Sequence, residues 1–207
     1  ELGGDDPYSN SKACAELICH LYSKSFFSKD KITCVTARAG NVIGGGDFAK
    51  NRVIPDFLRA LKKKKILYLR YPKAIRPWQH VIEPLYGYIL LLMKIANKNK
   101  NLVYGGWNFG PNKSNNVNVK NVISILNKNF KNKVKVRVKN KKKNLYKESD
   151  VLKLSSSKSK KGLGWKPKYN IIKSLRLIYE WEIIYNKNKK EVLNFTKNQI
   201  TNYLNQF

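Results

Sequence analysis

Acidic residues are scarce in this sequence, and so are cysteine and histidine. Of 207 residues, 13 are aspartate or glutamate and 42 are lysine or arginine, which gives a formal net charge of +29. Three cysteines and two histidines, none in a Cys-x-x-Cys arrangement, do not provide the spacing of a structural zinc site, so we expect no metal. Three thiols cannot all pair, which favours a reducing compartment, and we expect a cytoplasmic protein.

Long apolar runs are also missing. The longest, residues 85–96, is interrupted by Lys94 and is shorter than the roughly 20 residues of a membrane-spanning helix, so we expect no membrane partner. A hydrophobic content of 42%, with 12% aromatic residues, is nevertheless sufficient for a sizeable core. This excludes collagen-like, disulfide-scaffold and wholly disordered chains. The length allows one domain, or one domain with a small second lobe.

The positive charge has two interpretations. Lysine clusters at 62–65, 139–143 and 158–161 could hold a nucleic acid or another polyanion through its phosphates. However, asparagine is enriched together with lysine, as a coding bias would produce, and the clusters contain no recognised nucleic-acid-binding motif. We therefore interpret the charge as compositional and do not expect a nucleic-acid partner. A non-catalytic, basic, polyanion-binding remnant stays as the alternative of a different class.

The hydrophobic pattern predicts an α/β fold. Apolar residues recur at helical spacing over 8–27, β-branched residues indicate a strand over 32–39, and a glycine-rich loop follows at 40–47. Further helices are predicted at 53–64, 80–97, 117–130, 156–163, 171–185 and 191–203, and strands at 66–70, 102–109 and 133–138. This order predicts the end of a doubly wound, Rossmann-like parallel sheet with a small α+β lobe.

One local motif indicates chemistry. Tyr8 and Lys12 are four residues apart, so they share one face of the first predicted helix. The lysine ammonium can then favour the phenolate form of the tyrosine, which could act as a base near neutral pH. Because both residue types are common in this chain, the pair alone could equally be a surface contact.

The order of the motifs resembles the extended short-chain dehydrogenase/reductases, a family of NAD-dependent epimerases and dehydratases. The segments that carry the resemblance are 7–12, 36–42, 43–47, 52–56, 75–81, 106–111 and 163–167. Within the family, Gly-Gly-Gly-Asp at 44–47, Arg-Pro-Trp-Gln-His-Val-Ile-Glu-Pro-Leu at 76–85 and Trp-Asn-Phe-Gly-Pro at 107–111 are most similar to the dehydratases that act on CDP-glucose. The resemblance covers nearly the whole chain, and it implies a lyase that contributes to deoxysugar synthesis for a surface polysaccharide such as the lipopolysaccharide O-antigen.

The resemblance implies roles for residues around the Tyr-Lys pair. Tyr8 would take the proton of the hexose C4 hydroxyl while NAD takes the hydride, after which water leaves across C5 and C6 and the hydride returns to C6. Lys12 would lower the pKa of Tyr8 and hydrogen-bond the nicotinamide ribose. Ala39 and Gly40 would lie against the nicotinamide.

The resemblance also implies residues that bind the sugar nucleotide. They are Asn41, Arg52, Arg76 and Asn108, with the arginines suited to the pyrophosphate because a guanidinium can bind two oxygens. CDP-glucose is the expected substrate, and another NAD-dependent epimerase or dehydratase is the alternative within the family. His80 and Glu83 are expected to be structural.

The organisation implied by the resemblance is incomplete at its start. The family's glycine-rich dinucleotide turn, and the groups that remove water, lie upstream of Tyr8, so we expect a C-terminal portion that is inactive alone. Residues 1–50 are assigned to the end of the dinucleotide-binding domain, and 51–207 mainly to a sugar-nucleotide lobe with late Rossmann elements interleaved. The first helix matches the one through which the family forms homodimers. The four tryptophans are expected in the core.

Overall fold

The computed structural model describes residues 3, 6–27, 32–97, 105–130, 133–139 and 149–207. The chain forms two compact units, each built from three separate segments. Unit 1 consists of 1–39, 85–109 and 155–166, and unit 2 consists of 40–84, 110–154 and 167–207. Among the described residues, no helix has both the length and the apolar character needed to cross a membrane.

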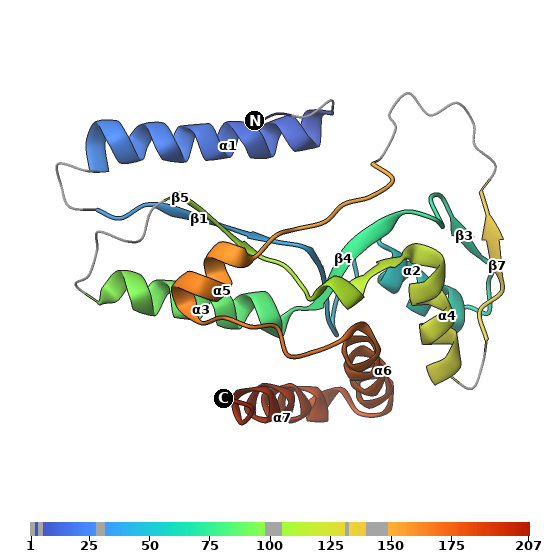
Figure 1. The fold of residues 1–207 in the computed structure, drawn as a ribbon. Coiled ribbons are helices and arrows are strands. Elements are labelled where there is room, and N and C mark those ends of the chain that lie inside the picture. Colours follow the sequence, from blue (N-terminus) through green and yellow to red (C-terminus); the bar gives the residue numbers. More distant parts are fainter. Residues whose placement is uncertain (1–2, 4–5, 28–31, 98–104, 131–132, 140–148) are drawn as a thin grey trace. The chain divides into compact units, whose positions relative to one another are not determined.

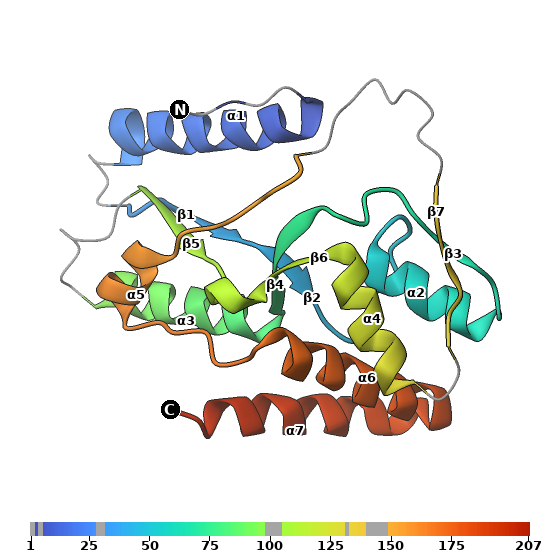
Figure 2. The ribbon, with the colours of Figure 1, turned by 45° about the vertical axis from the view of Figure 1, so that its right-hand side comes forward.

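Unit 1 is built on a pair of parallel strands. β1 (Val35–Ala39) pairs with β5 (Gly105–Phe109) in a register that ends at Ala39 opposite Phe109. Helix α1 (Pro7–Tyr22), which continues into a π-helical turn at Ser23–Phe27, covers one face of the pair, while α3 (Ile82–Ala96) and α5 (Ser157–Leu163) lie on the other (Figures 1 and 2). Helices on both faces of parallel strands are the arrangement of a doubly wound sheet.

The core of unit 1 is small and aromatic. Its buried members are Leu91, Trp107, Phe109 and Trp165. The rings of Phe109 and Trp165 meet edge to face, with centroids 5.2 Å apart. Gly87 on α3 allows this packing, because a Cβ there would lie 2.3 Å from Phe109 Cδ1.

Unit 2 contains two small sheets. In the first, β4 (Ile75–His80) is central, parallel to β2 (Asn41–Ile43) and antiparallel to β6 (Asn116–Asn118). In the second, β3 (Leu67–Leu69) pairs in parallel with β7 (Val136–Val138). The helices of unit 2 are α2 (Val53–Lys62), α4 (Val119–Asn129), α6 (Ile171–Lys187) and α7 (Val192–Leu204), with 3-10 turns at Lys113–Asn115 and Lys189–Glu191.

The core of unit 2 is larger and mainly aliphatic. It joins one face each of α2, α4 and α6, including the fully buried Phe57, Leu126 and Leu175. Trp78 on β4 belongs to the same cluster, and its indole N–H donates to the Val117 carbonyl at 2.9 Å. This satisfied donor lets a large amphipathic ring sit inside the core.

A buried carboxyl group anchors the C-terminal part of unit 2. Glu83, which is 1% exposed, accepts hydrogen bonds from the backbone N–H groups of Lys168 and Tyr169 and from the Tyr203 hydroxyl. Burial raises its pKa, although the three donors and the Lys168 charge oppose that rise. Glu83 therefore joins β4 and the start of α3 to the segment before α6 and to α7, and the expectation that it is structural agrees with these contacts.

The predicted helices agree well with the structure, but three boundaries are wrong. The helix expected over 117–130 begins at Val119, because Asn116–Asn118 forms β6 against β4. The helix expected over 80–97 begins at Ile82, because residues 75–80 form β4. The loop expected at 40–47 begins with a strand, β2. Both segments take strand conformation because they pair with each other, from Asn41 opposite Trp78 to Ile43 opposite His80, and local periodicity does not report a partner so distant in sequence.

The segments of the two units alternate along the chain. Unit 1 ends its first segment at Ala39 and resumes at 85–109 and 155–166. The assignment of 1–50 and 51–207 to a dinucleotide-binding and a sugar-nucleotide region stays a prediction. Part of the strand predicted at 102–109 and most of the lysine cluster at 139–143 lie outside the described residues.

Candidate active site

The first turn of α1 holds the predicted catalytic tyrosine. Asp6 is the N-cap, and its Oδ1 accepts from the backbone N–H groups of Tyr8 and Ser9 at 2.9 and 3.0 Å. Pro7 takes the first helical position, where its missing N–H costs nothing. A further bond from the Ser9 hydroxyl is the main reason that the pKa of Asp6 is lowered. The backbone at Tyr8 is thus fixed by the cap.

Tyr8 and Lys12 lie together on α1, as their spacing predicted. The Lys12 Nζ is 5.4 Å from the centroid of the Tyr8 ring, a cation–π distance. The Tyr8 side chain is 72% exposed in this chain, so its hydroxyl is open to a ligand. The structure thus places a positive charge over the ring of an exposed phenol, and the catalytic role of the pair stays a prediction.

The predicted nicotinamide contacts lie at the carboxyl end of β1. Ala39 is the last residue of β1 and is half-buried. Gly40 is the first residue of unit 2, and a Cβ on it would lie 2.5 Å from the Pro77 carbonyl oxygen. The glycine is therefore required for packing against β4, independently of any cofactor contact.

The predicted sugar-nucleotide residues divide between the units, with Asn41, Arg52 and Arg76 in unit 2 and Asn108 in unit 1. Asn41 lies on β2 and is half-buried, and Arg52 precedes α2 with its side chain 65% exposed and paired with Asp47 at 3.1 Å. Arg76 is 6% exposed on β4, and its Nη1 donates to the Ile75 carbonyl at 2.8 Å. These residues therefore differ widely in how much of their side chain a ligand could reach.

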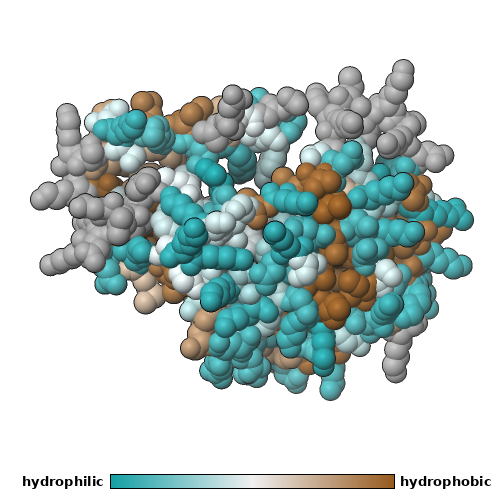
Figure 3. Space-filling model, in the orientation of Figure 1, coloured by the Kyte–Doolittle hydropathy of each residue, from teal (hydrophilic) through white to brown (hydrophobic). Residues whose placement is uncertain are grey.

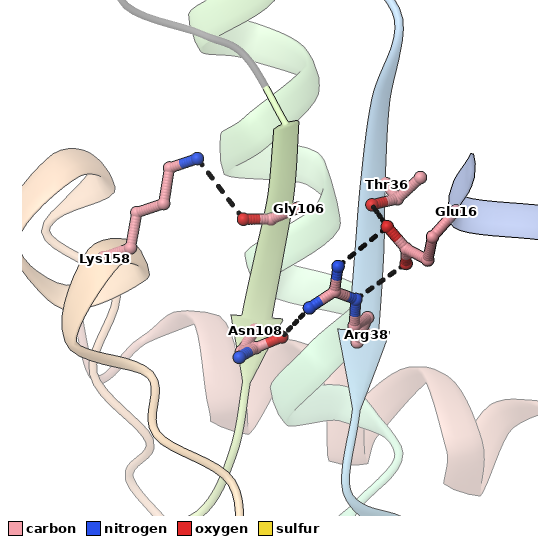
Figure 4. A network of polar contacts seen from close by, with 6 residues as sticks. All are labelled: Glu16, Thr36, Arg38, Gly106, Asn108 and Lys158. Carbon is pink, nitrogen blue, oxygen red and sulfur yellow. Dashed lines mark hydrogen bonds and ion pairs between the residues drawn. The ribbon is translucent and has the colours of Figure 1, made fainter. Parts of the chain in front are cut away.

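A polar network that sequence reasoning missed connects α1 to both strands of unit 1 (Figure 4). The Glu16 carboxylate accepts from Arg38 Nε at 2.6 Å, from Arg38 Nη2 at 2.7 Å and from the Thr36 hydroxyl at 2.7 Å. The remaining guanidinium nitrogen, Nη1, donates to Asn108 Oδ1 at 3.5 Å. Arg38 is the principal cause of the lowered pKa of Glu16, and Glu16 raises the pKa of Arg38 in return.

A signal for this network was present in the sequence. Glu16 lies four residues after Lys12 and eight after Tyr8, and no other acidic residue occurs in α1. In a chain this poor in acids, a glutamate on the reactive face of a helix points to a specific partner. Its partner Arg38 could not be identified, because helix–strand contacts leave no local pattern.

Lys158 approaches the same strand from α5. Its Nζ donates to the Gly106 carbonyl at 3.3 Å and lies 4.4 Å from the centroid of the Trp107 ring. Burial, with a smaller contribution from the nearby Arg38 charge, lowers its pKa. The cluster 158–161 thus includes one lysine with a defined packing role, while Lys160 and Lys161 are exposed, as are the lysines of 62–65.

His80 and the tryptophans have structural positions. Burial lowers the pKa of His80 to about 4, and its Nδ1 accepts from the Ile82 N–H at 3.4 Å. All four tryptophans are buried, at 8% exposure or less. A search of the described residues finds no group of histidine, cysteine and acidic side chains that could hold a metal ion.

Comparison with known proteins identifies the family. The family model described as GDP-mannose 4,6 dehydratase matches residues 2–178. The chain belongs to this family. Among characterised members of known sequence, CDP-glucose 4,6-dehydratase of Salmonella typhimurium is 36% identical over 98% of this chain and 57% of its own length. The family predicted from the motif order is thus confirmed.

Solved structures confirm the α/β fold of this chain. UDP-glucuronic acid 4-epimerase from Bacillus cereus superimposes with a TM-score of 0.71 at 20% identity, over 84% of this chain and 52% of the epimerase. dTDP-glucose 4,6-dehydratase from Bacillus anthracis gives 0.67 at 21% identity, over 92% and 55%. The chain spans between half and three fifths of the length of these relatives.

Proposed function

We propose that the protein is an NAD-dependent hydro-lyase that converts CDP-glucose to CDP-4-keto-6-deoxyglucose. The observation that carries the proposal is the Tyr8–Lys12 pair at the capped start of α1, with 5.4 Å between the ammonium and the ring. The identity to the Salmonella typhimurium protein favours dehydration, and cytidine as the base, over epimerisation.

The residues of α1 fit a dinucleotide at this position. The exposed Tyr8 hydroxyl and the exposed Lys12 ammonium are the donors that a nicotinamide ribose and a hexose hydroxyl require. NAD, when bound, supplies the acceptor and later the donor of the hydride. Tyr8 receives the proton of the C4 hydroxyl, and Lys12 stabilises the phenolate by its charge. Ala39 and Gly40 lie beside the nicotinamide in this proposal.

Asn41, Arg52, Arg76 and Asn108 bind the sugar nucleotide. Arg52 has the most accessible side chain of the four, and its guanidinium can form two parallel bonds to a pyrophosphate in exchange for its contact with Asp47. Arg76 lies on β4 and is buried, so its position is fixed before a ligand binds. Its side chain is less accessible to a ligand than that of Arg52. We assign Arg52 to the pyrophosphate and Arg76 to a more deeply inserted part of the ligand.

The proposal also covers the oligomeric state, the cellular compartment and the use of the product. α1 exposes Leu17, Ile18 and Leu21, and we assign this apolar stripe to contact with a second copy in a homodimer. The three free cysteines suit a cytoplasmic enzyme. The product, a 4-keto-6-deoxyhexose, is consumed by a reductase or aminotransferase in making a deoxysugar for a surface polysaccharide.

The decisive test uses protein expressed from the complete open reading frame, incubated with NAD and CDP-glucose in deuterium oxide. Dehydration gives a product lighter by one water that carries deuterium at C5, because the C5 proton leaves to solvent and returns from it. Epimerisation changes neither mass nor isotope content. UDP-, GDP- and dTDP-glucose serve as matched substrates, and turnover of one of these in preference would overturn the cytidine assignment.

Tyr8→Phe in the same protein is expected to lower kcat by about 10²- to 10⁴-fold, because the general base is lost while the ring remains. Affinity for CDP-glucose should stay within a factor of about 2, since the arginines that bind it are unchanged. Unchanged turnover would exclude Tyr8 from the mechanism. Absence of turnover together with tight, salt-dependent nucleic-acid binding would favour the polyanion-binding alternative.

A further inference from the structure

Helix α1 is held in unit 1 by unusually little apolar contact. Of residues 7–22, Ala13 alone is buried, and Leu17, Ile18 and Leu21 are each more than half exposed. Apolar contact of this size does not fix the rotation of a helix or its position along its own axis. Within unit 1, and apart from the proposed contact with a second copy, a more specific contact is therefore needed to set where Tyr8 and Lys12 lie relative to the end of β1.

The Glu16–Arg38 contact meets that requirement. Both carboxylate oxygens face the guanidinium, from Nε to one and from Nη2 to the other, which is the parallel, two-bond geometry that fixes orientation as well as distance. Thr36 adds a third bond to the same carboxylate. The Glu16 side chain is 18% exposed and the Arg38 side chain 42% exposed, so the carboxylate is better shielded from solvent than the guanidinium.

The pair connects the two predicted parts of the cofactor site. Glu16 lies one helical turn beyond Lys12 and two turns beyond Tyr8 on α1. Arg38 directly precedes Ala39 on β1 and continues to Asn108 on β5, as Figure 4 shows. A shift of α1 by one or two ångströms would break the two-bond geometry, so the pair allows one setting of the helix.

The surrounding strand is adapted to the guanidinium. A Cβ at Gly106 on β5 would lie 2.4 Å from Arg38 Nη2 and 2.8 Å from Cζ. Any side chain at 106 would therefore displace the guanidinium from its place above the strand. Glu16, Arg38 and Gly106, on three different elements, are each suited to the same contact.

We propose that Glu16 and Arg38 are positioning residues, which fix the Tyr8–Lys12 pair relative to the carboxyl end of β1. The role rests on the proposed function, because it concerns the placing of the base and its activating lysine. Neither residue touches the substrate. The contact acts by holding α1, and with it the Tyr8–Lys12 pair, in one position beside the end of β1 when the hexose is bound.

The test is kinetic and uses protein from the complete open reading frame. Glu16→Gln and Arg38→Lys are each expected to lower kcat by about 10- to 100-fold, because small displacements of a catalytic group have large effects, while KM for CDP-glucose stays within about 3-fold. Glu180→Gln is the control: it removes one partner of the Arg176–Glu180 pair on α6 and should leave kcat unchanged.

The split between kcat and KM separates positioning from loss of a binding contact. Removal of a ligand contact would raise KM, whereas displacement of the Tyr8–Lys12 pair lowers kcat and leaves KM within about 3-fold. Arg38→Lys keeps the local charge, so a lower kcat in this variant comes from the changed geometry of the contact.

Gly106→Ala provides a second route to the same outcome with Glu16 and Arg38 intact. It should reproduce the lower kcat with KM for CDP-glucose within about 3-fold, and it decides the question if Glu16→Gln fails to fold. Wild-type kcat, or an unchanged kcat with a raised KM, in the folded variants would overturn the proposal. If the wild type itself turns over no sugar nucleotide, or Tyr8→Phe is fully active, it is the proposed function that fails.

Discussion

The two units use buried and charged groups in opposite ways. Unit 2 has a large aliphatic core spanning α2, α4 and α6, and it buries a carboxyl group, Glu83, inside a complete set of donors. Unit 1 has a small aromatic core, and its principal carboxylate, Glu16, is partly solvated and paired with Arg38. Hydrophilic side chains cover much of the surface seen in Figure 3, in keeping with the excess of lysine.

Because of this difference, we expect unit 2 to contribute most of the folding stability and unit 1 to position the side chains that carry the chemistry. Apolar burial gives unit 2 its free energy of folding at about 25 cal/mol per Å², and Glu83 closes the C-terminal segment onto that core. In unit 1, the ion pair adds modestly to folding but determines where reactive side chains lie. Substitutions in unit 2 should thus lower the free energy of unfolding, and substitutions in the unit 1 network should lower turnover.

The largest expected effect is a difference in the free energy of unfolding between two single variants, one lacking the Glu83 carboxyl group and the other lacking that of Glu16. Glu83→Ala should lower the free energy of unfolding by about 3–5 kcal/mol, because two backbone N–H groups and the Tyr203 hydroxyl lose their buried acceptor. Glu16→Ala should cost about 1 kcal/mol, because water can replace part of its contacts. Urea denaturation of both variants measures the difference.

Glu83→Gln is the control for this comparison. It keeps an acceptor oxygen in place. Burial already raises the pKa of Glu83 and so disfavours the carboxylate. Loss of the charge alone should therefore lower the free energy of unfolding by less than loss of the whole group. A larger loss of stability from Glu16→Ala than from Glu83→Ala would break the distinction between the units.

A smaller effect should appear in the pH dependence of stability. The pKa of His80 in unit 2 is lowered to about 4, against about 6.5 in an unfolded chain, so the unfolded state binds the extra proton first as pH falls below 6.5. The free energy of unfolding should therefore decrease by about 2 kcal/mol between pH 6.5 and 5 on account of His80. The loss is complete only when the pH falls below the folded pKa.

His80→Asn isolates this contribution, because an amide oxygen can replace Nδ1 as acceptor for the Ile82 N–H. The raised pKa of Glu83 acts in the opposite direction in the same window, so the measured quantity is the difference between variant and wild-type slopes. Equal slopes for wild type and His80→Asn would contradict a buried, neutral imidazole.

The sequence allowed more of the fold to be predicted than of the site. Helices α2, α4, α6 and α7 follow apolar periodicity closely, and α5 ends at Gly164, whose φ of 66° is accessible to glycine at little cost. β2, β4 and β6 were missed because β4 lies between the other two and each strand owes its conformation to pairing with a segment distant in sequence.

Within the site, local contacts could be predicted and long-range ones could not. The Tyr8–Lys12 pair follows from helical spacing and was found. The Glu16–Arg38 contact depends on how a helix lies on a strand, and the burial of Arg76 depends on both neighbours of β4. The glycines at 40 and 106 were read as loop or motif residues, whereas each is required by one close neighbour.

The smallest expected effect compares two arginine–glutamate pairs. Arg176 and Glu180 lie one turn apart on α6, with Arg176 Nε 2.8 Å from Glu180 Oε1, and the arginine side chain is 65% exposed. A double-mutant cycle should give a coupling energy of about 0.3–0.5 kcal/mol that falls further in 1 M salt, because solvent and counterions screen an exposed pair. The Glu16–Arg38 pair, which has two aligned bonds and a better shielded carboxylate, should keep more of its coupling at the same salt concentration. Equal salt sensitivity for the two pairs would mean that the unit 1 contact is an ordinary surface pair, which could not hold α1 in one setting.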